Sequence, residues 1–273
     1  MNKKLVKLLA IIGVYILNVL LLLAIGKLVV PEDWSNNLAL GDVVTILQEI
    51  EMTVVFVLLS SKIFKIKINI GKKNLVKGIF WYGLVMCIAV AVNLAMNYAT
   101  PERSIMTALP FVLIEFITMM SIGVAEETVF RGVIFGACRE YFGESKKGIY
   151  LSVFVSALIF GGWHLPNLLF RPDLVVATIT QVIYAAEVGI IFAVIYYRSE
   201  NLLPCIILHG LFDFANSFWI CFADDVNDAL NTQNTTDIDI TSALGLITIC
   251  LPFVISGIWQ LRTVFKKQQI IER

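Results

Sequence analysis

Residues 5–30 read LVKLLAIIGVYILNVLLLLAIGKLVV, an apolar stretch interrupted by only two lysines and one asparagine. A helix that crosses the hydrocarbon core of a bilayer needs about 20 consecutive, mostly apolar residues, so this stretch predicts a membrane-spanning helix. A signal peptide has a shorter apolar region, of about 7–15 residues, that ends at a small-x-small cleavage site. This stretch is longer and has no such site near its end, so we expect it to be retained.

Seven further apolar runs of similar length follow along the chain. The weakest is the first of these, since Gln48, Glu49 and Glu51 interrupt it. The eight runs together predict an all-α, polytopic transmembrane helix bundle with about eight spans. They lie at about 5–30, 43–61, 75–99, 107–137, 148–168, 174–197, 201–222 and 241–261.

The composition excludes an ordinary soluble domain. Strictly apolar residues make up 58% of the 273 residues and charged residues 15%, whereas soluble domains have about 45–50% apolar, glycine included, and about 25% charged residues. We expect a single integral membrane domain over 1–273 with a functional core at about 110–220. Membrane lipid is an expected partner, and nucleic acid is not.

The basic residues predict the orientation in the membrane. Eight spans place both termini on one side, and 17 of the 21 lysines and arginines fall on that side. Because basic loops stay in the cytoplasm, we expect both termini to be cytoplasmic. The short, lysine-rich N-terminus and the compact size favour a bacterial plasma membrane. The 17 are Lys3, Lys4, Lys7, Lys62, Lys65, Lys67, Lys72, Lys73, Lys77, Arg139, Lys146, Lys147, Arg198, Arg262, Lys266, Lys267 and Arg273.

Ionisable residues inside the runs are the candidate functional residues, because such groups are costly in a bilayer. The fourth run carries Glu126, Glu127 and Arg131. Glu127 and Arg131 stand at i, i+4, so their side chains can meet on one helix face. Glu126 points about 100° away, which leaves it without a local counter-charge and able to face a cavity.

The only two histidines of the chain also lie within runs. His164 follows the glycine pair Gly161-Gly162, which lets another helix approach closely, and precedes Pro166, which can open the helix. In the seventh run His209, Asp213 and Asn216 stand at i, i+4 and i+7 and share one face. We therefore expect both histidines and the acidic residues to meet in one intramembrane site.

This set of side chains suits a hydrolase that activates water. A glutamate can take a proton from water, and a histidine can assist it or bind the developing oxyanion. The same groups can ligate zinc, and the candidate metal ligands are Glu126, His164 and His209. The sequence therefore leaves two alternatives open, a site without a cofactor and a site with a divalent metal such as zinc. The five cysteines lie in or beside apolar runs without a C-x-x-C pair, and we expect them to be buried packing residues.

Three segments in chain order carry a resemblance to a known family. They are Glu126-Glu127-x-x-x-Arg131, Phe160-x-x-x-His164 and His209-x-x-x-Asp213. In this combination the chain resembles the CPBP family of intramembrane CAAX proteases and bacteriocin-processing enzymes, over about residues 110–220. The resemblance implies an endopeptidase that cuts a membrane-associated peptide or protein. Prenylated CAAX proteins, bacteriocin leaders and peptide pheromones are all open as substrates.

The resemblance also implies roles for the catalytic residues. Glu126 is then the principal base, with Glu127 and Arg131 beside it, while His164 holds or activates the water. His209 and the residue four positions on face the oxyanion. The family has asparagine or aspartate there, and this chain has Asp213. Because an ionised aspartate cannot donate a hydrogen bond, Asp213 either stays protonated, orients His209 or binds a metal, and Asn216 is an alternative donor.

Two other readings of the sequence remain. Buried carboxylates and broken helices also serve transporters, although no repeated pair of broken helices is visible. A non-catalytic family member, such as a bacteriocin-immunity or binding protein, is the third reading. Of the remaining acids, we expect Glu115 and Glu187 to bond across helices, and Glu49 and Glu51 to lie at the outer interface.

Overall fold

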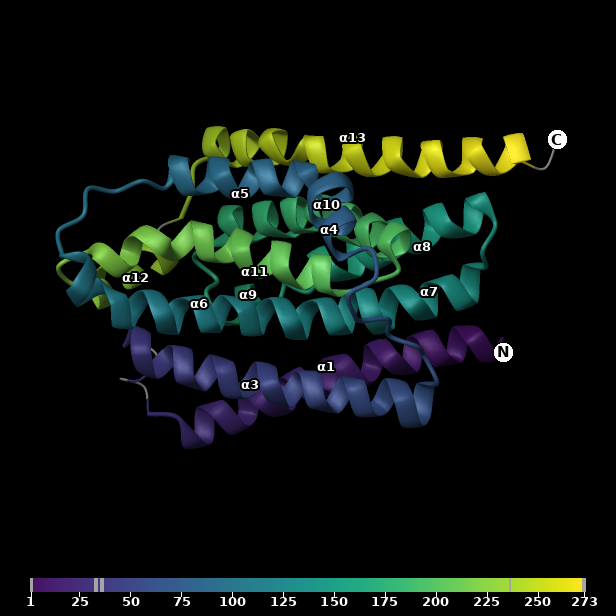
Figure 1. Cartoon of the computed structure of the whole chain (residues 1–273). Helices are drawn as coiled ribbons and strands as arrows, with labels where there is room; N and C mark the ends of the chain where they lie inside the picture. Colours follow the sequence, from purple (N-terminus) through teal and green to yellow (C-terminus); the bar gives the residue numbers. More distant parts are fainter. Residues whose placement is uncertain (1, 32–33, 35–36, 236, 272–273) are drawn as a thin grey trace.

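The computed structural model describes residues 2–31, 34, 37–235 and 237–271. These residues form helices and connecting loops, with no strand among them, as the apolar runs predict. Figure 1 shows the helices side by side along one direction. The elements in chain order are α1 (Lys3–Val29), α3 (Leu38–Leu59), a π-helical turn η1 (Ser60–Phe64), α4 (Leu75–Lys77), a π-helical turn η2 (Gly78–Tyr82), α5 (Leu84–Met96), α6 (Ile105–Glu127), a π-helical turn η3 (Thr128–Ile134), α7 (Phe135–Phe142), α8 (Lys146–Gly162), α9 (Asn167–Phe170), α10 (Val175–Ser199), α11 (Leu203–Ser217), a 3-10 turn η4 (Phe218–Phe222), α12 (Val226–Thr235) and α13 (Ile240–Ile271).

Each of the eight predicted runs corresponds to a helix or a helix pair. Within the described residues, seven helical segments are long and apolar enough to cross a membrane. The remaining run, the third in chain order at 75–99, forms a broken pair, Leu75–Tyr82 and Leu84–Met96, bent by 67°. Counting this pair as one span gives the predicted eight. The chain is therefore an integral, multi-pass membrane protein.

Helix α3 begins earlier than its apolar run suggests. Asn37 caps the helix, since its side-chain Oδ1 accepts a hydrogen bond from the backbone N–H of Leu40 at 3.1 Å. The apolar span therefore extends over Leu38–Phe64, and Glu49 lies near its middle. Glu51 lies at the middle of the same span, so the expectation that Glu49 and Glu51 lie at the outer interface is wrong.

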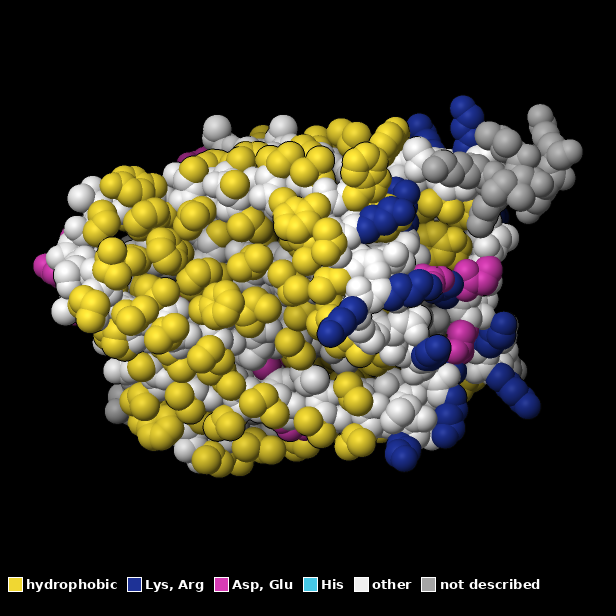
Figure 2. Space-filling model, in the orientation of Figure 1, with side chains coloured by type: hydrophobic (Ala, Val, Ile, Leu, Met, Phe, Trp, Pro, Cys, Tyr) yellow, Lys and Arg dark blue, Asp and Glu magenta, His cyan; other side chains and the backbone are white. Residues whose placement is uncertain are grey.

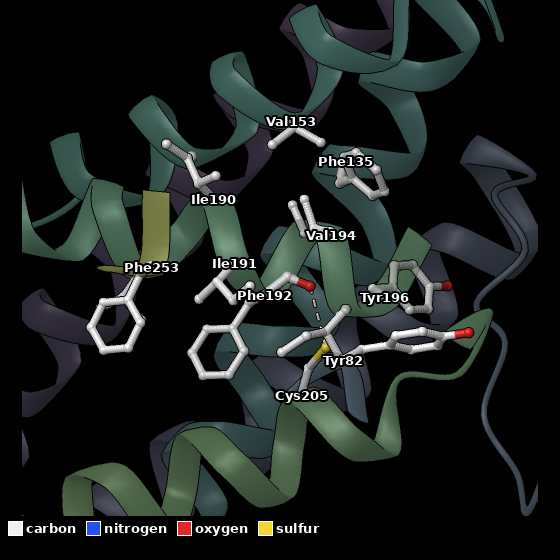
Figure 3. Close-up of a cluster of buried hydrophobic side chains, with 14 of the residues drawn as sticks. Tyr82, Phe135, Val153, Ile190, Ile191, Phe192, Val194, Tyr196, Cys205 and Phe253 are labelled. Atoms are coloured by element: carbon white, nitrogen blue, oxygen red, sulfur yellow. Dashed lines mark hydrogen bonds between the residues drawn. The ribbon is translucent and has the colours of Figure 1, made fainter. Parts of the chain in front are cut away.

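The bundle is assembled from two groups of helices. Helix α6 packs against α3 and α11, while α10 packs against α8 and α13. Gly161 of α8 lets α10 approach closely, because a Cβ there would lie 2.3 Å from the carbonyl oxygen of Val182. One large apolar cluster joins the groups, and its centre, formed by Phe135, Ile191 and Val194, is fully buried (Figure 3).

The basic residues gather at one end of the molecule. Figure 2 shows the dark blue lysine and arginine side chains at the end where Figure 1 places the N and C labels. Hydrophobic side chains cover most of the remaining visible face. We call this the basic end, and the end near α12 the opposite end. Arg273, one of the predicted cytoplasmic charges, lies outside the described residues.

Candidate active site

The paired glutamates stand where one long helix changes its winding. Helix α6 ends at Glu127 and continues into the wider turn η3, which contains Arg131. Such π-helical insertions frequently occur at functional sites. Arg131 Nη1 lies 2.8 Å from Glu127 Oε1, and the two side chains are 2% and 0% exposed. The predicted pairing of Glu127 with Arg131 is confirmed.

His209 of α11 links the acidic residues. Its Nδ1 lies 2.7 Å from Glu127 Oε1, and its Nε2 lies 3.2 Å from Asp213 Oδ2 and 3.5 Å from Glu126 Oε2. Because Glu127 faces an arginine, it is a carboxylate and accepts, so Nδ1 carries a proton and donates. Glu127 therefore fixes the orientation of the imidazole ring.

The other face of His209 requires a further proton. His209 Nε2, Glu126 Oε2 and Asp213 Oδ2 lie close together. Without a hydrogen on any of them, all three would be hydrogen-bond acceptors and none could donate to another. At least one proton is therefore shared among Nε2, Glu126 and Asp213. This arrangement can pass a proton between a carboxylate and an imidazole without rearranging the backbone, which is what general acid–base catalysis needs.

His164 belongs to the turn that follows α8. Its Nδ1 lies 3.3 Å from the carbonyl oxygen of Gly161, and it interacts electrostatically with Glu126. The Phe160 ring stands between the histidines, with its centroid 5.7 Å from that of His164 and 6.0 Å from that of His209. His164 thus faces the same space as Glu126 and His209.

Two phenylalanines enclose the buried charges. The Arg131 guanidinium lies 4.2 Å from the centroid of Phe160 and 5.2 Å from that of Phe192. Phe192 also stacks on His209 at 5.2 Å with 16° between the ring planes. The aromatic faces stabilise the cation, which matters because Arg131 Nη1 and Nη2 have no aligned hydrogen-bond acceptor among the described residues.

A cavity of about 850 Å³ brings the predicted residues together. Glu126, His164, His209 and Asp213 all line it, and the exposed fraction of the Glu126 side chain is 18%. The predicted convergence of these four residues on one cavity is confirmed, with the Glu127–Arg131 pair buried behind it. Asn216, the alternative donor, also lines the cavity.

Helices outside the predicted core add two polar residues. Glu49 Oε2 of α3 is buried without a hydrogen-bond partner among the described residues, and Tyr15 of α1 packs on Phe130 and Trp163 with ring centroids 5.2 Å and 4.5 Å apart. The sequence carries a signal for Glu49, which is an ionisable residue within an apolar run. It carries none for Phe192, one aromatic residue among many.

The remaining acids lie in different surroundings. Glu115 of α6 and Asp42 of α3 are both buried on helices that pack together, and Asp42 Oδ2 has no hydrogen-bond partner among the described residues. Glu187 Oε2 is likewise buried without a hydrogen-bond partner among the described residues, so the expected cross-helix bond is missing for that oxygen. Glu51 accepts a hydrogen bond from the Asn18 amide at 3.1 Å.

The candidate metal ligands are not grouped as a metal site in the described part of the chain. Over the described ranges, no three histidine, cysteine, aspartate or glutamate side chains are grouped closely enough to hold a metal ion. Glu126, His164 and His209, the candidate ligands, therefore line the same cavity without forming a metal-binding group. The five cysteines are free, and all except Cys87 are buried.

Comparison with known proteins supports the same class of protein. The family model for "Type II CAAX prenyl endopeptidase Rce1-like" matches residues 107–215. The match confirms the predicted relationship of this segment to the CPBP intramembrane proteases, and it supports intramembrane CAAX-type endopeptidase activity in general. No curated protein and no solved structure matches the chain.

Proposed function

We propose that this protein is an intramembrane endopeptidase whose base is Glu126. The observation that carries the proposal is the contact of Glu126 and Asp213 with one His209 nitrogen, inside a cavity large enough for a peptide. Glu126 takes a proton from a water molecule, and the resulting hydroxide attacks the carbonyl carbon of the scissile peptide bond.

The other residues have supporting roles in this proposal. His209 Nε2–H or the Asn216 amide donates to the oxyanion, while Asp213 orients His209. Glu126 then returns its proton to the leaving amine, so that water and one peptide bond give a carboxylate and an amine. His164 positions the water. Metal assistance stays a prediction, and no step here uses a metal.

The test replaces Glu126 by glutamine in protein reconstituted into liposomes. The amide keeps the shape of the side chain and cannot accept a proton. General-base catalysis typically contributes about 10²–10⁴-fold, so we expect Glu126→Gln to lose about 100-fold or more of the cleavage rate. Farnesylated CAAX-type peptides and unmodified leader-type peptides serve as reporters, with mass spectrometry to locate the cut.

Glu144→Gln is the matched control. Glu144 is exposed at the basic end, where it pairs with Arg139 at 2.9 Å, and its replacement should leave the rate unchanged. Full activity of Glu126→Gln would reject the glutamate-based mechanism. That result would favour the interpretation of the protein as a transporter or a non-catalytic binding protein.

A further inference from the structure

The catalytic cavity lies in one half of the bundle only. On α6 its lining residues extend from Glu115 to Glu126, on α10 from Leu174 to Val188, and on α11 from His209 to Ser217. On α10 and α11 this is the part farther from the basic end, and on α6 it is the part that leads into η3, near the middle of the Ile105–Phe142 span. Leu230, Ile238 and Leu246, from α12 to the start of α13, complete the lining.

The half toward the basic end contains a layer of buried side chains. Residues 127–135 and 188–196 are buried without exception, and Figure 3 shows Phe135, Ile191, Val194 and Tyr196 in this packing. The loop at residues 65–74, between η1 and α4, is called the basic connector. Its Ile66 and Ile68 close the buried layer further, because they fit against Gly136 and Gly132.

A second cavity lies between the basic end and the site, and its lining extends to Val124 and Thr128 on either side of the paired glutamates. It has a volume of about 570 Å³ and includes Ser61, Lys65 and Lys67 in its lining. None of the six predicted site residues lines it. The Glu127–Arg131 pair, 0% and 2% exposed, lines neither cavity.

The catalytic cavity has the length of a short peptide. Glu115 and Glu126 are separated by eleven residues on α6, or about 16 Å along the helix axis. An extended peptide covers about 3.3 Å per residue, so about five residues fit along this path.

Arg171 lines the catalytic cavity at the loop before α10. Its Nη2 donates to Asp173 Oδ2 at 2.7 Å, and this hydrogen bond holds the pKa of Asp173 below its usual range.

We infer that substrates enter from the end opposite the basic end, as extended segments of exported or externally anchored peptides. The inference rests on the proposed function and on the rule that the basic end is cytoplasmic. A substrate presented from the cytoplasm would meet the buried layer and the basic connector instead. The cleaved bond therefore lies in the outer half of the membrane.

Two single-cysteine variants test the route. Ala177 lines the catalytic cavity, and Ser61 lines the second cavity at the basic end. Intact cells that express Ala177→Cys or Ser61→Cys are treated with a small, membrane-impermeant, cationic thiol reagent. The wild-type protein, with its five free cysteines, gives the background.

We expect Ala177→Cys to react in intact cells and to lose peptide cleavage on modification. Ser61→Cys should react only after permeabilisation and should keep its cleavage rate. The reverse labelling pattern, labelling of both variants in intact cells, or labelling of Ala177→Cys only after permeabilisation would each overturn the inference. Thiol labelling reports the entry route and does not depend on catalysis. If none of the untreated proteins cleaves the peptide, that result contradicts the proposed function and leaves the labelling test of the route intact.

Discussion

Glu127 serves two partners with a single oxygen. Its Oε1 faces the Arg131 guanidinium at 2.8 Å and accepts the His209 Nδ1–H at 2.7 Å, while Oε2 has no hydrogen-bond partner among the described residues. A charge buried this completely is costly unless it is paired. Glu127 therefore contributes to stability through Arg131 and, in the proposed mechanism, to catalysis through the orientation of His209.

A double-mutant cycle separates these contributions. Glu127→Gln should destabilise the protein by about 3–5 kcal/mol, because it leaves Arg131 buried without a counter-charge. Combining it with Arg131→Met should recover only part of the loss, since His209 also loses its acceptor. Cleavage should stay low in the double variant. The measurement is denaturant stability in detergent, with peptide cleavage on the same samples.

The exposed pair Arg139–Glu144 supplies the control for that cycle. Their Nη2–Oε2 distance is 2.9 Å, and the Glu144 side chain is 62% exposed. Removing such a surface pair costs about 0–1 kcal/mol. A Glu127–Arg131 double variant with wild-type stability and activity would show that the contact with His209 has no role.

Helical spacing predicts much of the site at the level of residues. The i, i+4 pairs Glu127–Arg131 and His209–Asp213 are in contact as their spacing requires. Glu49 was misplaced because its helix begins at Leu38, five residues before the apolar run, which moves Glu49 about 7 Å deeper. A cap outside an apolar run changes the depth of every residue in the helix.

Helices α6 and α11 meet at a pair of glycines beside the site. A Cβ on Gly123 would lie 2.9 Å from the Gly210 nitrogen and 2.9 Å from the Ile206 oxygen. Gly123 precedes Glu127 by one turn, and Gly210 follows His209 directly. This contact therefore sets the distance across which Glu127 meets His209.

Adding one methyl group at this contact should separate the helices. Overpacking a filled site typically costs about 1–3 kcal/mol, so Gly123→Ala should lower the unfolding free energy by about that amount. It should also reduce cleavage in the fraction that stays folded. Gly245→Ala on α13 is the control, because nothing lies within 4 Å of its Cβ position. Equal cleavage and stability in both variants would contradict a distance set by the glycines.

The positions of the membrane-spanning helices follow from the lengths of the apolar runs in the sequence. The local winding of each helix, α-helical or π-helical, does not. The eight runs correspond to seven single spans and one bent pair within the described chain. The π-helical turn Thr128–Ile134 has no sequence signal that helical periodicity would reveal. Its width depends on packing by helices distant in sequence, which a single periodic pattern does not encode.

On the scale of the whole molecule, loop charges predict which ends of the helices lie together. The basic residues do gather at one end (Figure 2). They carry no information about where the cavity lies along the bundle. That depends on how bulky residues such as Phe135 and Ile191 fill the space between helices, and Figure 3 shows them within one cluster.

The buried layer at residues 127–135 and 188–196 also makes the protein an electrical insulator. The part of α10 within this layer, residues 188–196, spans about 12 Å, over which ions would have to cross buried apolar side chains. Liposomes containing the protein should therefore hold a potassium diffusion potential as long as protein-free liposomes, measured with a voltage-sensitive dye. Rapid loss of the potential would indicate a conducting path and favour transport. In the proposed enzyme, water that reaches the site from one side alone would let a cell cut peptides inside its membrane without losing the membrane potential.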